Sequence, residues 1–180
     1  MTYLYKTNDR TMKTIHKRAK RAATTSTFVV NLGEGKKLAV EAQIPYGAFI
    51  SEVRRAKNYA DLNELIGDRG FKMRSVKPLV AYLDLSNDKF ASLIGVSSRT
   101  LSRWHNDTLI GVMASKTLLE VDRLSKKGID IFGNANLFKE WLQKPNLALG
   151  DVAPIDILTE PYGVELVEDA LEAMEFGNIM

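Results

Sequence analysis

Residues 85–107 of the chain read LSNDKFASLIGVSSRTLSRWHND, and this stretch organises the rest of the sequence. Its pattern predicts a helix, a tight turn and a second helix. Gly95 lies at the turn, where glycine adopts the required backbone conformation without a side-chain penalty. Ser86 or Asn87 can cap the first helix, and Ala91 is small enough for the second helix to cross closely.

The second predicted helix separates an apolar inner face from a polar outer face. Ser97 can cap it, and Leu101 and Trp104 lie three residues apart on the inner face. The outer face holds hydroxyls, two guanidinium groups and an amide but no carboxylate: Ser98, Arg99, Ser102, Arg103 and Asn106. With Ser97, these are the candidate DNA-binding residues, because arginine forks recognise guanine, Asn pairs with adenine and hydroxyls reach phosphates. The alternative is a helical hairpin that only completes a core.

The small, apolar and glycine positions of this stretch resemble the helix-turn-helix of Xre-like repressors. The resemblance implies that the second helix enters the major groove of DNA by its N-terminal end.

Charge is distributed unevenly along the chain. Residues 1–127 hold 23 Lys and Arg against 12 Asp and Glu, a net charge of +11. Residues 128–180 hold 2 against 10, a net charge of −8, which gives +3 for the whole chain. The asymmetry predicts a polyanion as the partner of the first part and a basic surface as the partner of the second. In the alternative interpretation, the two parts attract each other.

Several classes of protein are disfavoured by the sequence. The absence of cysteine excludes disulfides and thiolate zinc sites and indicates a reducing compartment. No apolar run approaches the roughly 20 residues that span a bilayer, and the N-terminus lacks a signal peptide, so we expect a cytoplasmic protein without a membrane partner. Asp151, Asp156 and Glu160 have no accompanying base, nucleophile or phosphate-binding loop, and His105 has no partner in the sequence. We therefore expect no enzyme, metal or cofactor.

Upstream of the central stretch, the sequence predicts three further segments. Residues 1–26 are a basic, flexible arm, and residues 27–44 can form a short β-hairpin around Gly33-Glu34-Gly35. From Pro45, an apolar stripe predicts a helix, formed by Phe49, Val53, Ala56 and Ala60. Ser75 is the expected N-cap of the next helix, with Pro78 in its first turn.

Downstream, a helix is expected to end at Lys126, Lys127 and Gly128, because cations followed by glycine favour a helix C-terminus. This end divides a DNA-binding domain, residues 45–127, from an acidic domain, residues 128–180. Asn134 or Asn136 can cap the first helix of the acidic domain.

The last predicted helix has an apolar stripe opposite an acidic face. The stripe has spacings of 3, 4 and 3 and consists of Val164, Val167, Leu171 and Met174. The acidic face consists of Glu165, Glu168, Asp169, Glu172 and Glu175. Because the helix contains no Lys or Arg, this face would gain from a basic partner surface.

Residues 133–177 resemble the toxin-binding domain of the MbcA/ParS/Xre antitoxin family. The matching features are Phe138 with Trp141 and Leu142, the turn at 145–150, Pro154 with Ile157 and Leu158, and then Gly163, Val167, Leu171, Glu175 and Gly177. With the helical part before it, the resemblance covers roughly residues 45–180.

The resemblance implies a type II antitoxin, encoded beside a RES-domain toxin that consumes NAD. Its C-terminal domain would cover the toxin active site, and its helix-turn-helix would repress its own operon as a homodimer within a larger toxin-antitoxin assembly. The expected toxin-binding residues are Glu165, Glu168, Glu172, Glu175, Asn178 and Met180. The alternative is a stand-alone Xre-like repressor whose C-terminal domain serves dimerisation.

The expected fold is therefore mainly α. A helical helix-turn-helix domain precedes a small helical toxin-binding domain, and residues 27–44 can add the hairpin.

Overall fold

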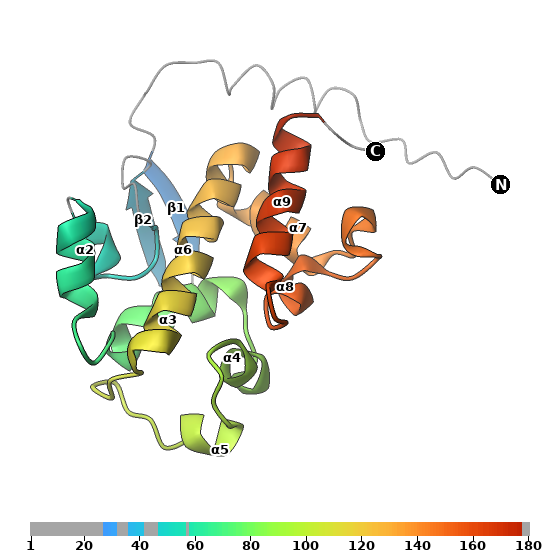
Figure 1. The fold of residues 1–180 in the computed structure, drawn as a ribbon. Helices are drawn as coiled ribbons and strands as arrows, with labels where there is room; N and C mark the ends of the chain where they lie inside the picture. Colours follow the sequence, from blue (N-terminus) through green and yellow to red (C-terminus); the bar gives the residue numbers. More distant parts are fainter. Residues whose placement is uncertain (1–26, 32–35, 42–46, 57, 178–180) are drawn as a thin grey trace.

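Helix α6 (Val112–Phe132) runs through the middle of the molecule (Figure 1). The computed structural model describes residues 27–31, 36–41, 47–56 and 58–177 of the 180-residue chain. Around α6, helices α3, α4 and α5 gather at one end, whereas α7, α8 and α9 lie along the other part of its length (Figure 1). The helix therefore connects the two regions that the sequence assigns to different partners.

The fold is mainly helical, as the sequence predicts. Strands β1 (Thr27–Asn31) and β2 (Lys37–Glu41) pair antiparallel, with Thr27 opposite Glu41, and β1 packs against α7. The predicted strands are confirmed, while the predicted turn at 33–35 and the basic arm at 1–26 lie outside the described residues. The helical elements besides α6 are η1 (Val53–Arg55), α2 (Tyr59–Ile66), α3 (Met73–Leu83), α4 (Asn87–Leu93), α5 (Ser98–Leu101), α7 (Ala135–Gln143), η2 (Leu147–Leu149), α8 (Pro154–Ile157) and α9 (Gly163–Glu175).

The predicted helix end at Gly128 is wrong, because α6 continues to Phe132 and ends at Gly133 in the left-handed conformation, with φ +64°. Gly128 instead provides close packing between helices. A Cβ atom at this position would lie 2.2 Å from Cε2 of Phe138 in α7, so only glycine lets the ring approach the α6 backbone. The expected domain boundary at residue 127 falls inside this helix. One cluster of buried apolar residues extends from Ala48 to Leu171.

The long helix predicted from Pro45 to Ala60 is also wrong. Phe49, Val53 and Ala56 are buried as expected, but only a short 3-10 turn, η1, forms among them. Ala60 belongs to α2 and is exposed. The stripe therefore predicts burial correctly for three of its four residues and predicts their secondary structure incorrectly.

A buried carboxylate explains this difference. Asp122 of α6 has no exposed surface, and its Oδ1 accepts hydrogen bonds from the amides of Ala48 at 2.9 Å and Phe49 at 2.8 Å. Its Oδ2 accepts from the amide of Ile50 at 3.0 Å. These amides are satisfied by a side chain distant in sequence, so they need no helical partners. Burial raises the pKa of Asp122 to about 6, against the three backbone bonds and the charge of Arg54, which lower it.

Helix α3 begins earlier than the sequence predicts. Lys72 is its N-cap, Pro78 lies in its interior, and Ser75 is buried and donates a hydrogen bond to Glu52. The first amides of α3, from Met73 and Arg74, donate to the carbonyls of Thr108 and Asn106 at 2.8 and 2.9 Å. Backbone carbonyls therefore replace the predicted side-chain cap, and this fixes the loop after α5 against α3.

We predict that Asp122 makes the protein more stable as the pH falls from 7.5 to 5. Its pKa in the folded state, about 6, lies above its ordinary value of 3.8, so the folded state binds the proton more tightly. Between these pH values Asp122 alone should add about 1 kcal/mol to the free energy of unfolding. Urea unfolding at both pH values should show this gain for the wild type and not for Asp122→Asn. Glu120→Gln, exposed on the same helix, should retain it. An unchanged pH dependence in Asp122→Asn would contradict the assignment.

Candidate functional site

The predicted helix, glycine turn and second helix are present as α4 and α5. The hydroxyl of Ser86 caps α4, and that of Ser97 accepts from the amide of Thr100 at 3.0 Å and caps α5. Gly95 has φ +70°, the left-handed conformation expected at the turn. Leu101 is buried and Trp104 is half-buried against the core, as predicted for the inner face.

The second helix is shorter than the predicted outer face requires. Helix α5 ends at Leu101, so Ser102 and Arg103 follow in a turn and Asn106 lies in the loop beyond. The amides of Arg103 and Trp104 donate to carbonyls three residues earlier, which tightens the chain out of the α-helix. Among the predicted DNA-binding residues after the cap, only Ser98 and Arg99 are therefore helical.

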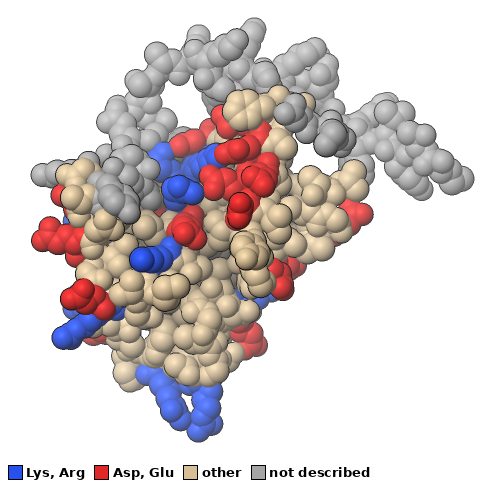
Figure 2. Space-filling model, viewed as in Figure 1, with Lys and Arg blue, Asp and Glu red and all other residues tan. Residues whose placement is uncertain are grey.

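The polar side chains of α5 and of the turn after it differ in whether they are already bonded within the chain. Ser98 donates a hydrogen bond to Asp88 of α4, a carboxylate that the sequence analysis did not include. The hydroxyl of Ser102 donates to the carbonyl of Arg99 at 2.9 Å. By contrast, Arg99 and Arg103 are exposed and pair with no carboxylate in the described part of the chain. Figure 2 shows Lys and Arg side chains projecting at the end of the molecule formed by α5.

Cations at the start of α3 extend this basic surface. Asp107 Oδ1 lies 2.8 Å from Nη1 of Arg74 and 3.5 Å from Nζ of Lys72. Nζ of Lys77 donates to Oδ1 of Asn106 at 2.6 Å, so that amide oxygen is already occupied. The loop after α5 therefore contributes one carboxylate, and the start of α3 contributes three lysine and arginine side chains beside it. This surface keeps a positive net charge.

Helix α9 presents the apolar stripe that the sequence predicts. Val167 and Leu171 are fully buried, and Val164 and Met174 are half-buried at the edges of the stripe. The helix packs against α6, α8 and η2. Its acidic residues consequently lie outside this buried stripe.

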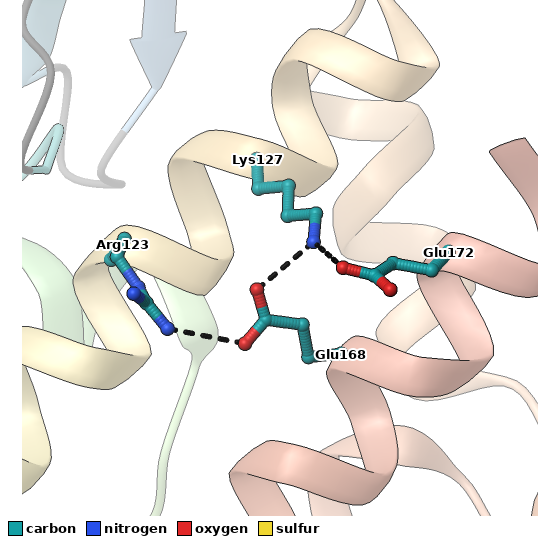
Figure 3. A network of polar contacts seen from close by, with 4 residues as sticks. All are labelled: Arg123, Lys127, Glu168 and Glu172. Carbon is teal, nitrogen blue, oxygen red and sulfur yellow. Dashed lines mark hydrogen bonds and ion pairs between the residues drawn. The ribbon is translucent and has the colours of Figure 1, made fainter.

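Two of the expected toxin-binding carboxylates face α6 of the same chain. Oε2 of Glu168 lies 3.2 Å from Nη2 of Arg123, and its Oε1 lies 2.9 Å from Nζ of Lys127. Lys127 also pairs with Glu172, so a single ammonium group bridges both carboxylates (Figure 3). The basic surface that this face requires is therefore supplied partly by α6, in line with the alternative that the two parts of the chain attract each other.

The environment of Lys127 favours its charged form. Partial burial alone would lower its pKa, but hydrogen bonds and charges from Glu172 and Glu168 outweigh this effect and raise the pKa. The ion pairs therefore persist through neutral pH.

The other expected toxin-binding residues have different positions. Glu165 and Glu175 are exposed and, like Asp169, form no ion pair with a described residue. Asn178 and Met180 lie outside the described residues. The described carboxylates available to a partner on α9 are thus mainly Glu165, Asp169 and Glu175.

The acidic residues considered for catalysis do not converge with a base. Asp156 pairs with Lys89 of α4, while Asp151 and Glu160 are exposed. His105 is exposed, and its backbone amide donates to the Thr108 hydroxyl at 2.9 Å. In the described ranges, no group of three or more His, Cys, Asp and Glu residues is placed to hold a metal ion. None of the helices found there is long and apolar enough to cross a membrane.

A comparison with protein families finds a match for the C-terminal part. Residues 127–177 match the model of the antitoxin Xre/MbcA/ParS C-terminal toxin-binding domain. The matched segment begins at Lys127 on α6 and continues past the end of α9. No curated protein matches the chain. Residues 127–177 are therefore similar to a toxin-binding domain of this antitoxin family.

We predict that Lys127→Met lowers the free energy of unfolding by about 0.5–1 kcal/mol, a modest loss because the ion pairs are partly exposed. The pKa of Lys127 is raised in the folded state, so its contribution is complete below the ordinary value of 10.5 and disappears as the pH rises through the folded-state pKa. Urea unfolding at pH 7 should therefore reveal the loss. Lys116→Met, an exposed lysine on α6 without an ion pair to a described residue, should change stability less. Equal effects would exclude a stabilising role for the network.

Proposed function

We propose that the protein is a non-enzymatic antitoxin that neutralises a cognate toxin through its C-terminal segment. The match of residues 127–177 to a toxin-binding domain carries this proposal. The fold supports it, because the matched residues form a packed unit of α7, α8 and α9 against the second half of α6.

The proposed partner is a RES-domain toxin that degrades NAD, and the C-terminal segment would cover its active site. Charge supports this choice. Residues 128–180 carry a net charge of −8, and Glu165, Asp169 and Glu175 remain exposed on α9. A cleft that binds an anionic dinucleotide requires positive charge, to which these carboxylates are complementary. Asn178 and Met180 are the candidates for entering that cleft.

The second proposed activity is repression of the protein's own operon through α4 and α5. The glycine turn, the exposed Arg99 and Arg103, and the cations at the start of α3 support it. Arginine forks on this surface would contact guanine, and the neighbouring cations would contact phosphates. We propose a homodimer within a larger toxin-antitoxin assembly as the DNA-binding form.

A stand-alone repressor whose C-terminal segment only dimerises is the competing proposal. It predicts that the product of the neighbouring gene is not toxic, or that this protein does not relieve its toxicity. A neutralisation experiment therefore separates the two functions.

We predict that expression of the adjacent RES-type gene alone stops growth and depletes cellular NAD, and that co-expression of the full chain restores both. Arg99→Ala with Arg103→Ala should neutralise as well as the wild type, because Arg99 belongs to α5 and Arg103 follows it directly, and α5 lies at one end of the molecule, away from α9 (Figure 1). Growth arrest without NAD loss would reject the assignment of the toxin to the RES type and leave the antitoxin function standing. Growth arrest that the wild-type chain fails to relieve would reject the antitoxin function.

We predict that the same double variant binds DNA from upstream of its operon at least tenfold more weakly, because each lost guanine contact costs about 1–3 kcal/mol. Fluorescence anisotropy at one fixed salt concentration measures this, since phosphate contacts make affinity salt-dependent. Lys139→Ala with Lys144→Ala, which removes the same charge from the α7 region, is the matched control and should bind nearly normally. Unchanged affinity in the arginine variant would show that α5 is not the reading element.

A further inference from the structure

Exposed apolar side chains are concentrated in the segment that matches the toxin-binding family. Six of the eight large apolar residues that are exposed in the described part of the chain lie there: Leu137, Leu147, Val152, Tyr162, Leu166 and Phe176. Apolar surface of this kind, when contiguous and bordered by polar residues, marks an interaction site.

Three of these residues belong to α9 or to its two caps. Leu166 and the half-buried Ala173 share a side of the helix, because a separation of seven residues returns to the same side, and the exposed Tyr162 and Phe176 lie at the two ends. Tyr162 is 80% exposed, Leu166 46% and Phe176 70%. Tyr162 and Phe176 flank the helix as its N-cap and C-cap, so this outer stripe runs the length of α9.

The outer stripe is distinct from the two faces of α9 that already have partners. Val167 and Leu171 point into the core, and Glu168 and Glu172 pair with α6 (Figure 3). Those contacts fix the rotation of the helix and leave the outer stripe unpartnered among the described residues.

Carboxylates lie within and beside the outer stripe. Asp169 lies at its midpoint, and Glu165 lies beside it, both exposed and neither paired with a described residue. Figure 2 shows Asp and Glu side chains over α9 with uncharged surface next to them. The surface therefore fits an apolar groove that holds a Lys or Arg side chain opposite Asp169.

This charge pattern argues against a second copy of the chain as the occupant. A two-fold interface brings the same patch of both copies together. Because Asp169 lies at the centre of the 162–176 stripe, antiparallel pairing of two α9 helices would place the two Asp169 carboxylates near each other in an apolar contact. Burying like charges in that way is unfavourable.

We propose that the outer stripe of α9, formed by Tyr162, Leu166, Ala173 and Phe176 around Asp169, is the surface that binds the toxin. The partner is a protein that presents an apolar groove containing a Lys or Arg side chain. Glu168 and Glu172 hold α9 against α6 and make no essential toxin contact. This inference rests on the proposed antitoxin function and replaces Glu168 and Glu172 among the toxin-binding residues that the sequence predicts.

The test compares purified wild type and variants in binding to the purified toxin by isothermal titration calorimetry. Leu166→Ser and Phe176→Ser should each weaken binding about 30-fold or more, the effect of removing an interface hot spot. Asp169→Lys should weaken it similarly, because the new ammonium group would repel the cation in the groove. Glu168→Gln and Glu172→Gln should change the dissociation constant less than about threefold, since their partners lie on α6.

The matched control is Met113→Ser on α6, which removes a side chain that is 77% exposed outside the outer stripe and should leave binding unchanged. Circular dichroism and thermal unfolding establish that each variant is folded. The exposed positions of the stripe make loss of fold easy to separate from loss of binding.

The outcomes distinguish this inference from the function on which it rests. Failure of the wild-type chain to bind or neutralise the toxin rejects the antitoxin function. Wild-type neutralisation together with normal binding by Leu166→Ser and Phe176→Ser overturns only the outer stripe. Loss of self-association in these variants, measured by light scattering with toxin binding intact, also overturns it and makes a second copy the occupant.

Discussion

The close contact between Gly128 of α6 and Phe138 of α7 is the constraint on which the architecture depends. The absence of a Cβ lets the aromatic ring pack against the α6 backbone, and α6 continues without a break through this contact from the region of α4 and α5 to that of α9. Further bonds reinforce this connection. The hydroxyl of Tyr82 donates to the carbonyl of Ala135 at 2.7 Å, and Lys89 of α4 pairs with Asp156 of α8. The basic and acidic regions are consequently joined by packing as well as by chain connectivity.

Local features of the sequence were predictable because neighbouring residues determine them. The Ser97 cap, the glycine turn at Gly95 and the buried stripe of α9 all follow from spacing and side-chain type. The end of α6 and the structure of residues 47–56 were not predictable in this way. A glycine after two lysines is typical of a helix end, and only the ring of Phe138 explains why it lies inside one. Likewise, the carboxylate of Asp122 is more than 70 positions away from the amides that it binds.

The candidate interfaces show the same division. Sequence identifies Arg99 and Arg103 as exposed cations and α9 as an amphipathic helix, but it does not show which acidic residues are already paired. Glu168 and Glu172 are four residues apart on α9, as Arg123 and Lys127 are on α6, and packing of the two helices brings these sets together. The acidic face of α9, for which the sequence predicts a basic partner protein, is thus partly neutralised within the chain.

This intramolecular pairing changes which physical interaction can give α9 its affinity and specificity. Partly exposed ion pairs contribute little stability, but they orient a helix whose opposite side is fixed in the core. The apolar atoms of Tyr162, Leu166 and Phe176 are then displayed in a fixed arrangement, and their burial by a partner would supply most of the binding free energy. Asp169 at the centre would contribute chiefly to selectivity, because an acidic group surrounded by apolar surface penalises every partner that lacks a cation at the corresponding position.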